Sequence, residues 1–116
     1  MITGAHTIIY STNPEADKMF FKDILKFPYI DIGHDWLIFA LRPSELAIHP
    51  SEEDSRQELY LMCDNINEFI KEMKECKIKC SKPDQQRWGT LTSVTLPGGG
   101  TIGVYEPRHE RPAAGT

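Results

Sequence analysis

The sequence has no long hydrophobic run and no excess of positive charge. No apolar stretch approaches the ~18 residues that a membrane span needs. The opening MITGAHTIIYS lacks the basic and apolar regions of an export signal. The formal net charge is −4, whereas a nucleic-acid-binding domain carries a basic face. We therefore expect a cytoplasmic protein that binds neither membranes nor nucleic acids.

Cysteines are also scarce, and their number is odd. The chain has three, Cys63, Cys76 and Cys80, which cannot form a complete disulfide framework. Cys76 and Cys80 are separated by three residues, with no second pair to complete a tetrahedral zinc site. We expect all three to be free thiols.

The remaining composition is that of an ordinary globular domain. Of 116 residues, 40% are hydrophobic and 26% are charged, and a chain of this length can bury a core of its own. We expect a single domain over residues 1–107. The polar, Pro/Gly/Ala-rich residues 108–116 are expected to form a flexible C-terminal tail.

The order of predicted elements in the first half is β-α-β-β-β. Residues 6–11 alternate and are rich in β-formers, which predicts a strand. Asn13 is a natural N-cap, and Pro14 suits the first position of a helix. The apolar residues that follow recur at helical spacing: Ala16, Met19, Phe20, Ile24 and Phe27. Three further strands are predicted at 29–33, 36–42 and 45–50.

The second half repeats this order. Residues 58–63 predict a strand, and Asp64 is the expected cap of a helix. The apolar stripe of that helix comprises Ile66, Phe69, Ile70 and Met73. Strands are then predicted at 77–81, 89–96 and 101–106. The class is therefore α+β, with module one over about 4–50 and module two over about 57–107.

Alternation within the strands separates two kinds of face. In TIGVY, Ile102 and Val104 point to one side while Gly103 and Tyr105 point to the other. The apolar side is suited to lie under a helix, and the mixed side is suited to line a pocket. Gly103 needs an explanation of its own, because a glycine weakens a strand.

Three segments together resemble the vicinal-oxygen-chelate superfamily, which includes glyoxalase I, bleomycin-resistance proteins and extradiol dioxygenases. They are HTIIYSTNPEADKMFFKDILKF, ELYLMCDNINEFI and WGTLTSVTLPGGGTIGVYEP. The resemblance extends over about residues 4–107. It implies two tandem βαβββ modules that form a curved mixed sheet around an open cup. It also implies a homodimer, in which the partner chain completes the cup.

The resemblance further implies a candidate metal site. Superfamily members that bind a divalent ion take four ligands from the first and last strands of the two modules. The matching positions are His6, Glu45 and Glu58, while the fourth position, counted from Pro97, is occupied by Gly103. The ion could be Zn, Ni, Fe, Mn or Mg, which the sequence does not distinguish. In an enzyme, Glu58 is the expected catalytic residue, moving a proton.

Each of these residues also has an ordinary structural interpretation. His6 can be a hydrogen-bonded strand residue, Glu45 a solvated acid at a strand edge, and Glu58 the partner of an arginine. Trp88 can be a packing residue beside its turn. The expected pocket lining comprises His49, Tyr60, Met62, Trp88 and Tyr105.

Three functions remain open at this point. The first is a metal-assisted lyase, isomerase or dioxygenase acting on a small oxygenated metabolite. The alternative is a metal-free protein that binds or sequesters a small molecule, in the manner of the bleomycin-resistance branch, which agrees with the loss of a carboxylate at Gly103. The third is a structural or regulatory module without a ligand.

Overall fold

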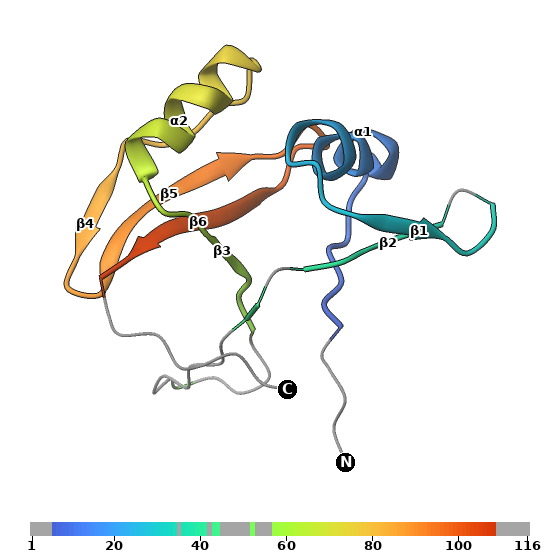
Figure 1. The fold of residues 1–116 in the computed structure, drawn as a ribbon, viewed down its shortest axis with the longest axis horizontal. Helices are drawn as coiled ribbons and strands as arrows, with labels where there is room; N and C mark the ends of the chain where they lie inside the picture. The colour runs from blue at the N-terminus through green and yellow to red at the C-terminus, as the bar shows by residue number, and fades with distance from the viewer. Residues whose placement is uncertain (1–5, 35, 42, 45–51, 53–56, 109–116) are drawn as a thin grey trace.

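The second half of the chain forms a mixed four-stranded sheet with a helix on one face (Figure 1). In this computed structural model, residues 6–34, 36–41, 43–44, 52 and 57–108 are described. The elements are β3 (Tyr60–Met62), α2 (Ile66–Glu75), β4 (Asp84–Gln86), β5 (Gly89–Thr95) and β6 (Thr101–Pro107). The strand order is β3-β6-β5-β4; β3 runs parallel to β6, and the other neighbours are antiparallel. The predicted α+β class and β-α-β-β-β order are confirmed here.

Helix α2 packs its apolar stripe on the sheet, as predicted. Ile66 and Met73 are buried in the core. The predicted cap is wrong by one residue: the side chain of Asn65, not Asp64, accepts a hydrogen bond from the amide of Glu68 at 3.1 Å. The carboxylate of Glu106 in β6 accepts from the amide of Ile66 at 2.9 Å, which ties the start of the helix to the sheet.

The strand predicted at 77–81 is replaced by the end of α2. Lys77 adopts a positive φ of 61°, and the amide of Ile78 donates to the carbonyl of Met73 at 2.8 Å. This is the hydrogen-bonding pattern that stops a helix at a left-handed residue. Of the predicted strand, only a single bridge from Cys80 to Val94 remains. The second strand of the module is instead β4.

The first half supplies a helix and a small hairpin. Helix α1 (Pro14–Met19) begins where predicted: the side chain of Asn13 accepts from the amide of Ala16 at 3.3 Å. The helix continues as one wider turn, η1 (Phe20–Ile24). Strands β1 (Tyr29–Asp31) and β2 (Leu37–Phe39) then pair antiparallel.

The strand predicted at 6–11 does not form: these residues pair with no other described strand. Ile8, Ile9 and Tyr10 are exposed, Tyr10 to 89%. A strand needs a neighbour to receive its backbone hydrogen bonds. The strand predicted at 45–50 lies outside the described residues, together with Glu45 and His49.

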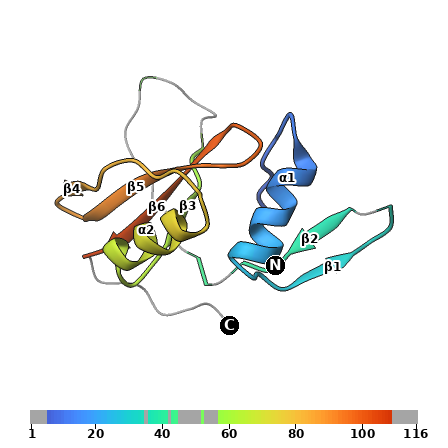
Figure 2. The same cartoon turned by 90° about the horizontal axis from the view of Figure 1, so that it is seen from above.

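Two contacts join the halves. Phe20 is only 1% exposed and belongs to the same core as α2, β5 and β6. Asp17, 7% exposed, accepts a hydrogen bond from the amide of Gly98 at 2.7 Å. A Cβ on Gly98 would lie 2.6 Å from the Asp17 carboxylate, so any larger residue here would have to displace that side chain. Figures 1 and 2 show the β5–β6 turn reaching α1.

Among the described helices, none has the length and apolar character needed to cross a bilayer.

Candidate functional site

The two faces of the sheet differ as the alternation predicted. Ile102 and Val104 are buried on the side of α2, whereas Gly103 and Tyr105 lie on the opposite side and are partly exposed. Directly paired residues of neighbouring strands project to the same face. From the pairing of β3, β5 and β6, the residues on the side away from α2 are Tyr60, Met62, Leu91, Ser93, Gly103 and Tyr105. We call this side the open face.

The ring of Tyr60 lies directly over Gly103. The two residues are partners in the parallel pair of β3 and β6. A Cβ on Gly103 would lie 2.3 Å from Cδ1 and 2.4 Å from Cε1 of Tyr60, well inside the ~3.5 Å of an ordinary carbon–carbon contact. Glycine in this strand therefore allows an aromatic ring to lie against the backbone.

Tyr60 belongs to a group of three rings, with Trp88 and Tyr105, that we call the aromatic cluster. The ring centroids of Tyr60 and Tyr105 are 5.9 Å apart at 90°, and those of Trp88 and Tyr105 are 5.2 Å apart at 80°. The ring centroids of Tyr60 and Trp88 are 6.4 Å apart, and the two ring planes meet at 72°. All three pairs have the favoured edge-to-face geometry. Tyr60 and Trp88 remain 38% and 37% exposed, so the rings support one another and still offer surface to a ligand.

Arg108 holds the turn that carries Trp88. Its backbone amide donates to the carbonyl of Trp88 at 2.9 Å. Its guanidinium donates to Thr90 Oγ1 at 3.1 Å, to the carbonyl of Gly89 at 3.3 Å, and to the carbonyl of Gln86. This role was not predictable from the sequence, because an arginine after the last predicted strand carries no signal of its partner. It arises because Pro107, the residue before Arg108, pairs with Gly89.

A hollow of about 390 Å³ adjoins the aromatic cluster at Tyr60. Its polar wall includes Gln57, Glu58, Ser93 and Thr101, and Ile9 of the first half contributes apolar surface. The hydroxyl of Tyr60 donates to Glu58 Oε2 at 2.8 Å. The hollow thus combines a ring, a carboxylate and hydroxyl groups.

Comparison with solved structures gives the fold. The structure aligns with TnmS3, an antibiotic binding protein from Streptomyces sp. CB03234 (TM-score 0.64, 19% identity, 92% of this chain and 99% of that one). It aligns with lactoylglutathione lyase from Agrobacterium tumefaciens (TM-score 0.65, 12% identity, 90% of this chain and 92% of that one). A glyoxalase/bleomycin resistance protein/dioxygenase superfamily member from Sphaerobacter thermophilus also aligns (TM-score 0.59, 22% identity, 90% of this chain and 98% of that one). The chain has the glyoxalase/bleomycin-resistance/dioxygenase fold. No protein-family sequence model and no curated protein matches the sequence.

Within this fold, the predicted metal ligands are only partly placed. His6 is exposed on the unpaired N-terminal segment, and Glu58 accepts from Tyr60 on the wall of the hollow. The ring of Tyr60 covers the fourth position, Gly103. The described part of the chain brings no three His, Cys, Asp or Glu side chains together as a metal site. Because Glu45 lies outside that part, the metal site stays a prediction.

The predicted pocket residues are brought together in part. Tyr60, Met62 and Tyr105 share the open face, and Trp88 joins them from the turn before β5. Trp88 therefore packs against its neighbours and also presents part of its ring to solvent. His49, the fifth predicted pocket residue, is not among the described residues.

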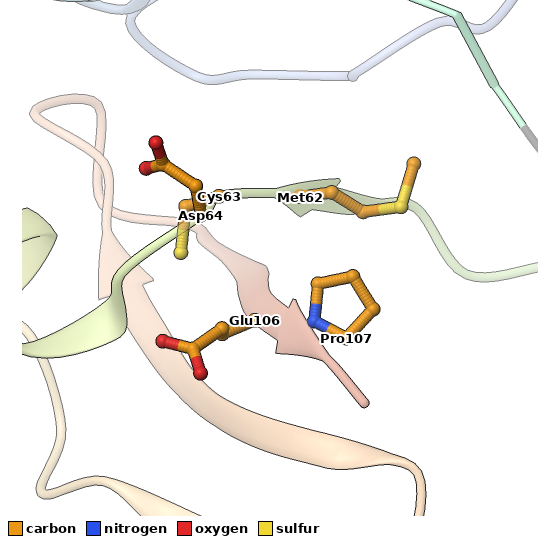
Figure 3. Close-up of a pocket in the computed structure, with 5 residues that line it drawn as sticks. All are labelled: Met62, Cys63, Asp64, Glu106 and Pro107. Atoms are coloured by element: carbon orange, nitrogen blue, oxygen red, sulfur yellow. The ribbon is translucent and has the colours of Figure 1, made fainter. Parts of the chain in front are cut away.

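A second hollow, of about 380 Å³, lies between the end of β3 and β6 (Figure 3). Met62 and Pro107 line one end, and Cys63, Asp64 and Glu106 line the other. Burial, followed by the charge of Glu106, raises the pKa of the Cys63 thiol to about 11. The thiol is therefore protonated at neutral pH and is a poor nucleophile. All three cysteines are free, as predicted.

Proposed function

We propose that this protein binds a planar aromatic small molecule on its open face, without a metal ion. The observation that carries the proposal is the aromatic cluster built over Gly103. Its three rings have fixed mutual geometry and leave part of Tyr60 and Trp88 exposed. Rigid rings of this kind bind a flat ligand with little loss of conformational entropy.

The neighbouring hollow supports the same function. Its volume of about 390 Å³ lies within the ~300–1,000 Å³ typical of small-molecule sites. Its polar groups can orient a ligand that stacks on Tyr60. TnmS3, which is similar in fold over 92% of this chain, is an antibiotic binding protein. Among the functions expected from the sequence, metal-free binding is therefore the one that the geometry favours.

A thermal-shift screen tests this proposal. Planar aromatic compounds added at ~100 times their Kd should stabilise the native state by about 2.7 kcal/mol. Trp88→Ala should reduce this stabilisation, because it removes one ring of the cluster. Lys71→Ala is the control, since Lys71 is exposed on α2, on the opposite side of the sheet from the aromatic cluster, and its loss should leave the shift intact. Absence of any shift across the screen, or equal loss in both variants, would contradict the proposal.

A metal-assisted lyase, isomerase or dioxygenase is the second candidate. It is supported by the likeness in fold to lactoylglutathione lyase and by the position of Glu58 on the wall of the hollow. His6, Glu45 and Glu58 would hold the ion, which would stabilise negative charge developing on a substrate oxygen. Metal analysis of the purified protein, with thermal shifts against divalent ions, tests this candidate. A shift abolished by Glu58→Ala, and by a His6→Ala, Glu45→Ala double variant, would favour the enzyme over metal-free binding.

We also propose a homodimer. Large apolar side chains of the first half are exposed, among them Ile8, Ile30, Ile32 and Trp36. Soluble monomers rarely expose apolar residues in such concentration, so a second copy of the chain is the expected cover. Sedimentation velocity should give the mass of a dimer at micromolar concentration. An Ile30→Asp variant should dissociate, and a monomeric wild type would contradict the proposal.

A further inference from the structure

One wall of the hollow beside Tyr60 comes from the first half of the chain. That wall is Ile9, whereas the other described lining residues belong to the second half, to β3, β5, β6 or the segment just before β3. Ile9 is 41% exposed and lies on a segment that pairs with no described strand. Its position therefore depends on the contacts that fix this segment to the sheet.

The segment is fixed at the β5–β6 turn, just after Ile9. The Ser11 hydroxyl lies beside Gly98, since a Cβ built on Gly98 would be 2.7 Å from Ser11 Oγ. The same hydroxyl accepts a hydrogen bond from the amide of Asn13 at 3.0 Å, which joins it to the start of α1. Asp17 Oδ1, in that helix, accepts from the amide of Gly98 at 2.7 Å. The Asp17–Gly98 contact thus holds the Ile9 segment against the turn.

The turn in turn leads directly to the hollow. Its backbone is closed by two hydrogen bonds, from the amide of Gly99 to the carbonyl of Leu96 at 2.9 Å and from the amide of Leu96 to the carbonyl of Gly100 at 2.8 Å. Thr101, which follows it at the start of β6, lines the hollow. The two walls of the hollow are therefore connected through one contact, in which the Asp17 side chain is shielded from solvent.

We infer that Asp17 is a positioning residue for the proposed binding site: its hydrogen bond to Gly98 raises the affinity for a planar aromatic ligand by holding Ile9 against that ligand. This inference rests on the proposed small-molecule binding. Because coupling between two equilibria is reciprocal, the bound ligand stabilises the contact by the same factor. The ligand therefore also strengthens the junction between the two halves of the chain.

Calorimetry with two uncharged planar probes, the bicyclic coumarin and the tricyclic phenazine, tests the inference. Ile9→Ala should weaken binding about three- to tenfold, the ratio expected when part of an aliphatic side chain no longer contacts the ligand. Asp17→Ala should weaken binding by a similar factor. The double variant should bind no more weakly than either single variant, since both changes remove the same contact with the ligand.

Two further variants separate positioning from a general loss of structure. Asp17→Asn keeps the acceptor oxygen and should bind both probes like wild type. Asp23→Ala removes an exposed carboxylate from η1 in the same half of the chain and should leave the affinity unchanged. Circular dichroism and thermal unfolding show that each variant is folded at the temperature of the binding measurement.

Hydrogen exchange of the Gly98 amide, followed by NMR, gives a second readout. With saturating probe, this amide should exchange about three- to tenfold more slowly in wild type, the same factor by reciprocity. In Ile9→Ala the slowing should be absent. Unchanged affinity in Asp17→Ala, or losses from Asp17→Ala and Ile9→Ala that add in the double variant, would overturn the inference while leaving small-molecule binding in place. Failure of wild type to bind either probe would overturn the inference and count against the proposed function as well.

Discussion

Gly103→Ala is the substitution that most directly probes why the strand contains a glycine. The new Cβ would lie 2.3 Å from the Tyr60 ring, so the ring must move by about 1 Å or more to reach ordinary contact. Displacing the ring disturbs its contacts with Trp88 and Tyr105, each worth ~0.5–1.5 kcal/mol beyond simple burial. Replacing glycine by alanine in a strand returns ~0.5–1 kcal/mol. The expected net loss of stability is about 1–2 kcal/mol, within the range of overpacking.

The assay is urea unfolding followed by circular dichroism. The urea concentration at the midpoint should fall, while the slope of the unfolding free energy against urea concentration stays the same. Gly100→Ala is the matched control, because its Cβ would meet nothing within 4 Å. In a Tyr60→Ala background the ring is absent, and Gly103→Ala should be neutral or stabilising by ~0.5–1 kcal/mol. The coupling energy of this cycle is thus about 2 kcal/mol. Equal effects of Gly103→Ala in both backgrounds would refute the explanation of the glycine by the Tyr60 ring.

Three other substitutions or treatments have defined outcomes. Arg108→Ala should cost about 1–2 kcal/mol through lost hydrogen bonds and shift the indole N–H resonance of Trp88; an unshifted resonance would contradict its role in holding the turn. Cys63, whose pKa is raised from 9.0 to about 11, should react with iodoacetamide roughly 100-fold more slowly than the thiol of a short unstructured peptide at neutral pH, and comparable rates would disprove its protonated state. Asp17→Ala should destabilise the fold by about 1–3 kcal/mol because the part-buried amide of Gly98 loses its acceptor; an unchanged urea midpoint would count against that contact joining the halves.

Periodicity predicted the elements whose sides differ in polarity. Ile102 and Val104 alternate with Gly103 and Tyr105, and the structure places the first pair against α2 and the second pair on the open face. Local chemistry also predicted the start of α1 at Asn13. These features depend on neighbours in the sequence, which a single chain displays directly.

Features that depend on distant partners could not be predicted. Strand β4 has three polar, exposed residues and forms because it pairs with β5, so no apolar pattern marked it. The stop of α2 at Lys77 depends on a backbone conformation that lysine rarely adopts. Arg108 gains its role only when β6 brings it beside the Trp88 turn.

Gly103 has a structural explanation that the sequence did not reveal. The resemblance to the superfamily implied that Gly103 stands where a metal-binding carboxylate would lie, and that stays a prediction. The structure adds a physical reason for the glycine: the parallel pairing of β3 with β6 places the Tyr60 ring on it. That pairing joins residues far apart in the sequence, so the contact between Tyr60 and Gly103 was not predictable from either segment alone.

An NMR titration of isotope-labelled protein with a planar aromatic compound that gives a thermal shift tests ligand binding on the open face most directly. We predict that saturable shifts concentrate on the amides of Tyr60, Gly103 and Tyr105 and on the indole N–H of Trp88, while the exposed side of α2 remains unperturbed. Shifts confined to α2 or to the hollow around Cys63, or no shifts at the solubility limit of the compound, would contradict it.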